Sequence, residues 1–82
     1  MINEELSRED KVIKTFYDNK DLMNSREVKK ELNLKLGQVR STLENLQRRR
    51  MVERFGLDKK HKYRPCLYQL SDRGLDYAKR KF

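Results

Sequence analysis

LGQVRSTLENLQRRRMVERFGLDKKHKYRPCLYQL, residues 36–70, is the stretch that decides the fold. On a helical wheel, four of its apolar residues cover one face about 80° wide. These four are Leu36, Val39, Leu43 and Leu46. The opposite face of the same segment is polar, which is typical of a helix that packs on one side only. The spacing therefore predicts a one-sided helix over residues 36–48.

A strand pattern replaces the helical pattern after residue 50. Residues 51–55 and 66–70 are predicted to be strands, and residues 56–63 between them are predicted to be a polar, basic loop. Pro65 suits the start of an edge strand, where its missing N–H is not needed. The sequence therefore predicts a two-stranded hairpin directly after the helix.

Capping residues place three more helices around this segment. Ser7 and Ser71 each precede a predicted helix, and Asn24 forms a capping box with Glu27. The helix that follows Asn24 is short and ends near Asn33, which tolerates a left-handed conformation. Just before Asn24, the apolar pair at 22–23 is a candidate two-residue strand. The residues predicted to face inward from these helices are Val12, Ile13, Phe16, Tyr17, Val28, Leu32, Leu75 and Ala78.

These elements predict one mostly helical α+β domain over residues 1–82. Its helix-turn-helix spans about 24–49, its wing about 51–70 and its C-terminal helix about 72–81. Eighty-two residues are enough for one small core. A hydrophobic content of 35% with 41% charged residues would also fit a disordered chain. The apolar residues are periodic, however, and this favours an ordered domain.

Most of the net charge lies in one part of the chain. Residues 35–64 hold ten Lys or Arg and three Asp or Glu, so they account for +7 of the total net charge of +8. Like charges repel one another in a compact state and add nothing to its stability. A basic field over the predicted helix and hairpin therefore indicates a polyanionic partner.

The order helix, helix, helix, strand, strand, helix resembles winged helix-turn-helix transcription regulators. Residues 68–74, YQLSDRG, are similar to the Tyr-x-Leu-Thr-x-x-Gly stretch of the multiple-antibiotic-resistance and phenolic-acid-decarboxylase regulator families. Ser71 replaces Thr there and keeps the capping hydroxyl. The resemblance covers residues 22–78. It implies a three-helix core, a two-stranded wing, a C-terminal helix and binding to double-stranded DNA.

Two positions depart from these families. Lys35 stands where they usually place Ser or Thr before the recognition helix, and Arg50 stands where they usually place Gly after it. An Arg at a position of positive φ carries a modest strain cost. This favours a helix that ends one or two residues after residue 48. Both departures add positive charge beside the expected DNA-binding face.

The polar face of the predicted helix is the first half of the expected DNA-binding site. Gly37 costs about 1 kcal/mol relative to Ala within a helix, a cost that makes sense where the backbone must approach a phosphate closely. Amide and hydroxyl side chains beside it suit base edges or phosphates. We expect contacts with DNA, in its major groove, from Lys35, Gly37, Gln38, Arg40, Ser41, Asn45 and Arg48.

The hairpin loop is the second half of that site. Its only acid is Asp58, and four cations are expected to contact the flanking backbone or a minor groove. These cations are Lys59, Lys60, Lys62 and Arg64. Tyr63 is expected to stack either on the wing backbone or on a sugar.

The sequence predicts neither enzymatic activity nor a cofactor. It contains no nucleophile–base pair, paired carboxylates or glycine-rich phosphate loop. His61 lacks neighbours at metal-ligand spacing, so no metal site is expected. Cys66 cannot form an internal disulfide, which favours a reducing cytoplasm. With neither a signal peptide nor a membrane-spanning run, we expect a cytoplasmic, nucleoid-associated protein.

Three functions remain open at this point. A sequence-specific transcription regulator is favoured, and the alternatives are a protein-interaction module and a nonspecific or replication-associated nucleic-acid binder. Regulators of this size commonly bind two half-sites as dimers. We therefore expect a homodimer formed through the first helix, with Tyr17, and the C-terminal helix, with Tyr77 and Phe82.

Overall fold

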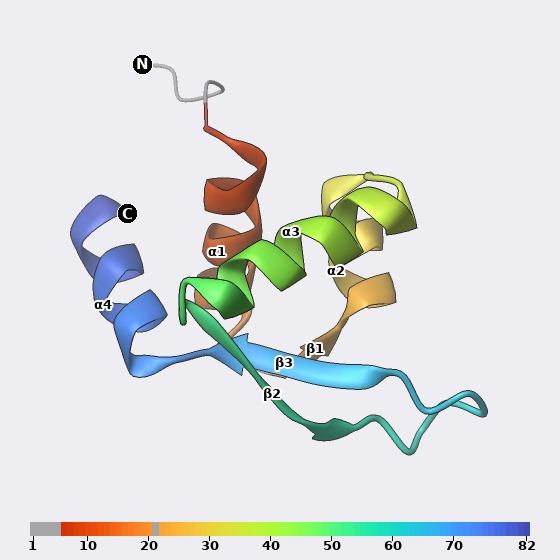
Figure 1. Cartoon of the computed structure of the whole chain (residues 1–82). Coiled ribbons are helices and arrows are strands. Elements are labelled where there is room, and N and C mark those ends of the chain that lie inside the picture. Colours follow the sequence, from red (N-terminus) through yellow and green to blue (C-terminus); the bar gives the residue numbers. More distant parts are fainter. Residues whose placement is uncertain (1–5, 21) are drawn as a thin grey trace.

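The computed structural model describes residues 6–20 and 22–82, so parts of the predicted domain 1–82 at residues 1–5 and 21 lie outside the described residues. The elements are α1 (Arg8–Asn19), β1 (Met23–Asn24), α2 (Ser25–Leu32), α3 (Leu36–Arg48), β2 (Val52–Leu57), β3 (Cys66–Leu70) and α4 (Asp72–Lys81). The α1–α3 bundle lies over the sheet, and the β2–β3 hairpin extends away from it (Figure 1). The predicted α+β winged-helix architecture, with its C-terminal helix, is confirmed.

The sheet has three antiparallel strands in the order β1-β3-β2, whereas two were predicted for the hairpin alone. The additional strand is β1, in which Met23 pairs with Tyr68 and Asn24 pairs with Leu67. The candidate strand at residues 22–23 is therefore displaced by one residue. Because β1 occupies the second edge of β3, it ties the start of α2 to the wing.

The second strand is longer than predicted. It ends at Leu57 instead of Phe55, because a β-bulge at Phe55 interrupts the regular alternation. Arg54 pairs with Tyr68, and the next pair is Gly56 with Leu67. Gly56 has a φ of 144°, a conformation that L side chains rarely adopt. The bulge interrupts the alternation of inward and outward side chains, and this alternation is the pattern from which strand ends are predicted.

The predicted helix caps are present. The Ser7 hydroxyl accepts the Asp10 N–H at 3.1 Å. The Ser71 hydroxyl accepts the Gly74 N–H, also at 3.1 Å. Both bonds of the capping box at Asn24 are present at 2.9 Å. Asn33 ends α2 with a φ of 55°, as predicted, so α2 begins and ends where its sequence signals lie.

The prediction that the third helix runs past residue 48 is wrong. Arg49 caps α3, and Arg50 adopts a left-handed φ of 60°. Such a conformation costs a non-glycine residue about 1–2 kcal/mol. Hydrogen bonds of the turn offset this cost: the Met51 N–H donates to the Leu46 carbonyl at 2.8 Å, and the Ser71 hydroxyl donates to the Arg50 carbonyl at 2.5 Å.

One hydrophobic core joins α1, β1, α2, α3, β2 and α4. Its buried apolar residues are Val12, Ile13, Phe16, Met23, Val28, Val39, Leu43, Leu46, Met51, Val52 and Ala78. The apolar face predicted for the third helix is therefore confirmed at Val39, Leu43 and Leu46. Leu75 was predicted to face inward, but it is 37% exposed. The packed side of α4 centres on Gly74 and Ala78, and Leu75 lies about 100° around the helix from Gly74.

Candidate nucleic-acid interface

The polar side of α3 faces away from the core. Of the residues predicted there, all are exposed except Gln38, which is partly buried; the exposed ones are Lys35, Gly37, Arg40, Ser41, Asn45 and Arg48. Gly37 has open space where a Cβ atom would stand. The helix therefore presents a continuous polar surface, which we call the α3 face.

Gln38 has a structural role that its sequence position did not suggest. Its side-chain oxygen accepts the Lys35 backbone N–H at 3.1 Å. Lys35 cannot cap the helix with its own side chain as Ser or Thr would, because an ammonium group only donates. The bond to Gln38 is thus the reverse half of a capping box, and Gln38 retains its amide N–H groups for another partner.

The α3 face also contains an acid. Glu44 forms an exposed ion pair with Arg48 at 3.3 Å. The spacing of four residues is the usual one for such a pair on a helix. Arg48, predicted to contact DNA, is therefore partly neutralised by a residue on the same face.

Asp58 is the first residue of the wing loop, which spans residues 58–65, and it anchors that loop. The residue is only 6% exposed. Its carboxylate accepts hydrogen bonds from Asn24 Nδ2 at 3.0 Å and from the Lys60 backbone N–H at 3.1 Å. His61 Nε2 lies 3.6 Å away. Burial raises the pKa of Asp58, but these hydrogen bonds and the nearby positive charge outweigh burial and leave the pKa below its ordinary value. Asp58 is thus a buried anchor as well as the one acid of the loop.

The ring of Tyr63 contacts two side chains. It stacks on His61 with the ring centroids 5.7 Å apart. The Arg26 guanidinium, at the start of α2, lies 4.5 Å from the Tyr63 centroid. Sequence reasoning missed Arg26, because residues so far apart in the chain leave no local signal of their contact.

The four predicted wing cations are exposed and lie together on the tight loop that joins β2 to β3. They are Lys59, Lys60, Lys62 and Arg64. The Asp58 N–H donates to the Pro65 carbonyl at 2.7 Å, which closes the loop at its base. Within residues 6–20 and 22–82, none of the four cations forms an ion pair with a carboxylate. Their charge is therefore available to an external anion.

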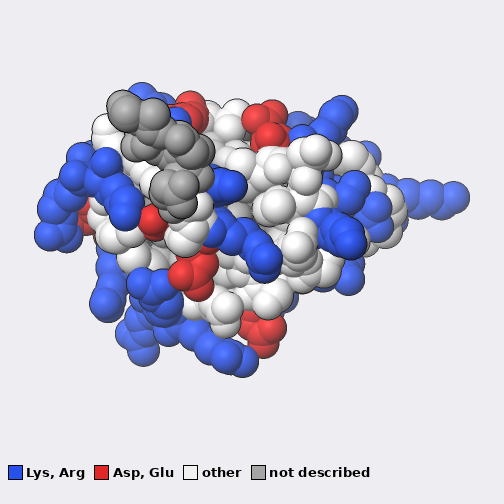
Figure 2. Space-filling model, turned by 90° about the horizontal axis from the view of Figure 1, so that it is seen from above, with Lys and Arg blue, Asp and Glu red and all other residues white. Residues whose placement is uncertain are grey.

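Positive charge extends beyond the segment in which the sequence concentrates it. Lys and Arg side chains occupy much of the outline in Figure 2, and the acidic side chains in this view are fewer and scattered between them. Part of this charge comes from α4, whose last turn contains Lys79, Arg80 and Lys81. Positive charge in this view therefore lies around much of the rim of the molecule.

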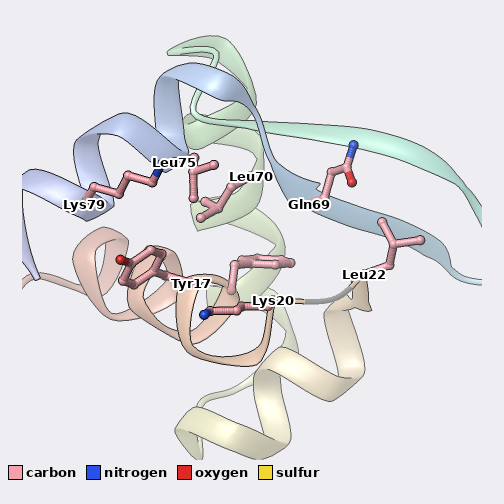
Figure 3. Close-up of a pocket in the computed structure, with 8 residues that line it drawn as sticks. Tyr17, Lys20, Leu22, Gln69, Leu70, Leu75 and Lys79 are labelled. Carbon is pink, nitrogen blue, oxygen red and sulfur yellow. The ribbon is translucent and has the colours of Figure 1, made fainter.

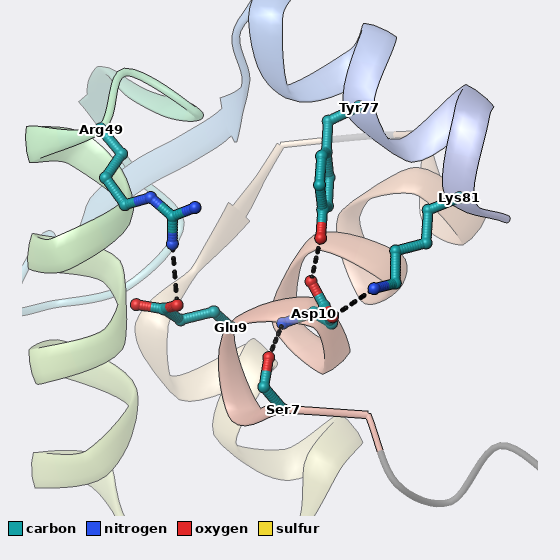
Figure 4. A network of polar contacts seen from close by, with 6 residues as sticks. All are labelled: Ser7, Glu9, Asp10, Arg49, Tyr77 and Lys81. Carbon is teal, nitrogen blue, oxygen red and sulfur yellow. Dashed lines mark hydrogen bonds and ion pairs between the residues drawn. The ribbon is translucent and has the colours of Figure 1, made fainter.

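A polar network fixes α4 on α1 (Figure 4). Asp10 accepts the Tyr77 hydroxyl at 2.6 Å and pairs with Lys81 at 3.0 Å. Burial raises the pKa of Asp10, but these bonds outweigh burial and lower the pKa overall. Glu9 pairs with Arg49 at 2.9 Å, just after α3. The Tyr77 hydroxyl, on a residue expected at a dimer surface, is therefore engaged within the chain.

A shallow apolar groove of about 480 Å³ lies between α1, β3 and α4 (Figure 3). Its lining residues are Phe16, Tyr17, Lys20, Leu22, Gln69, Leu70, Leu75 and Lys79. None of them belongs to α3 or to the wing loop. The groove is thus a second surface, separate from the α3 face, and its signal in the sequence was Leu75, which was assigned to the core.

No cluster of three metal-ligating side chains occurs among the described residues. Half-buried Cys66 accepts a hydrogen bond from Arg54 at 3.4 Å. No helix in the described part of the chain is long and apolar enough to cross a membrane.

No protein-family model matches the sequence, and no curated protein matches it. Solved structures do resemble the fold. A cysteine-to-serine mutant of MarR from E. coli, complexed with operator DNA, has a TM-score of 0.77 at 22% identity over 93% of this chain and 53% of that chain. A MepR mutant from a clinical isolate of S. aureus has a TM-score of 0.76 at 19% identity over 93% and 55%. A double mutant of ZitR from Lactococcus lactis, in its apo form, has a TM-score of 0.75 at 12% identity over 88% and 52%.

The present chain spans about half the length of each of these solved chains. At such low identity the likeness establishes the winged-helix fold, which the sequence resemblance implied. The MarR mutant was solved with operator DNA, and another S. aureus MepR mutant was solved bound to an oligodeoxyribonucleotide.

Proposed function

We propose that this chain binds double-stranded DNA sequence-specifically and acts as a transcription regulator. The observation that carries the proposal is the combination of an exposed polar helix face with a loop of four exposed cations, on a fold that a MarR mutant also has in its complex with operator DNA. In this proposal, α3 lies in the major groove and the wing loop contacts the flanking backbone or minor groove.

The two surfaces have different chemical tasks. Ser41, Asn45 and the amide N–H groups of Gln38 have the size and hydrogen-bonding groups to read base edges. Lys59, Lys60 and the other wing cations can neutralise phosphates, which adds affinity without sequence information. The proposed function is binding, with no catalytic step.

Selection of bound sequences from a random duplex pool tests this function. We expect an enriched motif, and an affinity that falls with salt at a log–log slope of about −4 to −5 if four to six phosphates are neutralised. Binding with no enriched motif would favour the nonspecific or replication-associated alternative. Absence of binding at low salt would favour the protein-interaction module.

A specific observation also favours self-association. The apolar groove has Leu75 and Tyr17 on its two helical sides, on the first and last helices through which a homodimer is expected. We propose that a second copy covers it, so that two wings can address two half-sites. Sedimentation at tens of micromolar should give a dimer for the intact protein and a monomer for Leu75→Arg. A monomeric intact protein would contradict this assembly.

A further inference from the structure

One buried side chain joins the helix-turn-helix to the wing. Asn24, which is 1% exposed, caps α2 with its Oδ1 atom, which accepts the Glu27 N–H at 2.9 Å. Its Nδ2 atom donates to Asp58 Oδ2 at 3.0 Å. The two ends of one amide therefore start α2 and hold the first residue of the wing loop.

A second contact joins the same two parts of the molecule. Arg26 lies over the Tyr63 ring, near the other end of the wing loop, and the same ring stacks on His61. We call these five residues the wing clamp: Asn24, Arg26, Asp58, His61 and Tyr63. The clamp thus connects the beginning of α2 to both ends of the loop.

Backbone hydrogen bonds close the wing loop on itself, as from Asp58 to Pro65 and from Arg64 to His61, but they do not fix it relative to α3. Phe55 and Leu57, the last apolar residues of β2, are 61% and 51% exposed, so these two side chains give the end of the hairpin little apolar support. A loop without such support samples many conformations, and ordering it on binding costs free energy. A buried hydrogen bond between a neutral amide and a carboxylate is stronger than one between neutral groups. It can therefore order the loop in the free protein, so that less free energy is lost on binding.

We propose that Asn24 and Asp58 are positioning residues for DNA binding. They hold the wing cations in a fixed position relative to the α3 face, so that both surfaces engage one duplex together. This inference rests on the proposed function, and it adds a requirement that lies outside both DNA-contacting surfaces. Asn24 and Asp58 touch no DNA in this scheme, and their effect passes through Lys59, Lys60 and the other wing cations.

The bond can be broken and rebuilt without loss of the helix cap. Asn24→Asp keeps a side-chain oxygen for the Glu27 N–H, but it places a second carboxylate against Asp58. Adding Asp58→Asn reverses the bond: the new amide at position 58 would donate to the new carboxylate at position 24, and its oxygen would still accept the Lys60 N–H. The double variant also restores the original net charge.

We expect Asn24→Asp to weaken duplex binding by about three- to tenfold, as for a loop that must be ordered on binding. Amide exchange at Lys60 and Arg64 in the free protein should accelerate, while exchange in α3 stays unchanged. The double variant should recover affinity and slow exchange. Asn33→Asp, at the exposed end of the same helix, controls for the change in charge and should lose less affinity.

Three outcomes overturn the proposal. Asn24→Asp binding as tightly as Asn33→Asp would mean that the clamp does not serve DNA binding. A double variant as weak as the single one would mean that the reversed bond does not position the wing. Failure of the intact protein to bind any duplex would end the proposed function, and the role of the clamp in it, even if the exchange measurements still detect the bond.

Discussion

The α3 face and the wing loop are fixed in space by different kinds of interaction. The inner side of α3 consists of Val39, Leu43 and Leu46, which are all buried, so the helix cannot rotate without exposing them. The wing loop has no such backing, and its anchors are single polar or stacking contacts to α2. Packing therefore sets the surface proposed to read bases, whereas a few long-range contacts set the surface proposed to hold phosphates.

The joint between these two regions should be the most sensitive point of the molecule. Gly74, in the first turn of α4, lies against the backbone of Met51, just before β2, and a Cβ atom at position 74 would overlap the Met51 carbonyl. That carbonyl also accepts the Ser71 N–H at 3.0 Å. Because backbone cannot move aside as a side chain can, we expect Gly74→Ala to lower the free energy of unfolding by about 3 kcal/mol.

Urea denaturation measures this change, and Gly37→Ala is the matched control. Nothing lies near a Cβ atom at Gly37, so the same substitution there should raise stability by up to about 1 kcal/mol. If the two variants were equally stable, the close approach of α4 to Met51 would not matter to the fold. If Gly37→Ala also weakens DNA binding, the open backbone at that position serves the interface.

The same contrast explains what could be predicted from the sequence. The α3 face follows from the spacing of Val39, Leu43 and Leu46, and the caps follow from Asn24 and Ser71, because these interactions lie within a few residues of each other. The bond from Asn24 to Asp58 and the contact of Arg26 with Tyr63 depend on tertiary structure and leave no periodic signal. The short strand β1 was predicted as a candidate at residues 22–23, one residue early. Its pairing with β3 could not be predicted, because two residues are too few to show alternation.

Some errors came from alternatives that local reasoning cannot decide. The chain accepts a left-handed Arg50 because the turn satisfies the backbone of Leu46 and Met51, a balance that propensity alone does not reveal. Leu75 has the spacing of a core residue, but its exposure depends on which side of α4 meets α1. The hydrogen bond from the Lys35 N–H to the Gln38 side chain was not predicted, and contact of Gln38 with DNA stays a prediction.

Removing the wing charge should separate affinity from specificity. We expect Lys59→Ala, Lys60→Ala and Lys62→Ala together to weaken binding to every duplex alike and to reduce the salt slope by about two to three. The same triple variant should keep the sequence preference of the intact protein. Fluorescence anisotropy at several salt concentrations measures both, and an unchanged slope would mean that the wing does not contact phosphates.

Removing a side chain from the α3 face should instead change the sequence preference and leave the salt dependence of binding unchanged. Asn45→Ala is expected to change the preference at one base pair by about 1–3 kcal/mol while leaving the salt slope intact. Gln38→Ala is a less clean test, because it also removes the cap on Lys35, worth about 1 kcal/mol of stability. Equal losses on all sequences for Asn45→Ala would mean that α3 only positions the protein on the backbone.

The acid on the α3 face should have a smaller and opposite effect. Glu44→Gln removes a negative charge beside Arg48 while it keeps the size and helix propensity of the side chain. We expect modestly tighter binding to all duplexes, by less than about 1 kcal/mol, because exposed ion pairs are weak. A loss of affinity confined to particular sequences would instead assign Glu44 to base reading, since a carboxylate can accept from cytosine.

Lowering the pH should have the smallest of these effects, and it should act differently on the packed helices and on the wing loop. Asp10 holds α4 on α1 and Asp58 holds the wing loop, and both carboxyls have a pKa below the ordinary value in the folded chain. Their contributions to stability are therefore complete above the unfolded pKa near 4, and they fade as pH falls from about 5 through the folded-state pKa.

Asp10→Asn should flatten the pH dependence of global unfolding over that range. Asp58→Asn should instead flatten only the pH dependence of amide exchange in the wing loop, because opening that loop exposes little core. Matching effects of the two substitutions on global unfolding would mean that the wing folds and unfolds together with the helices, and that the contrast between the two regions does not extend to their stability.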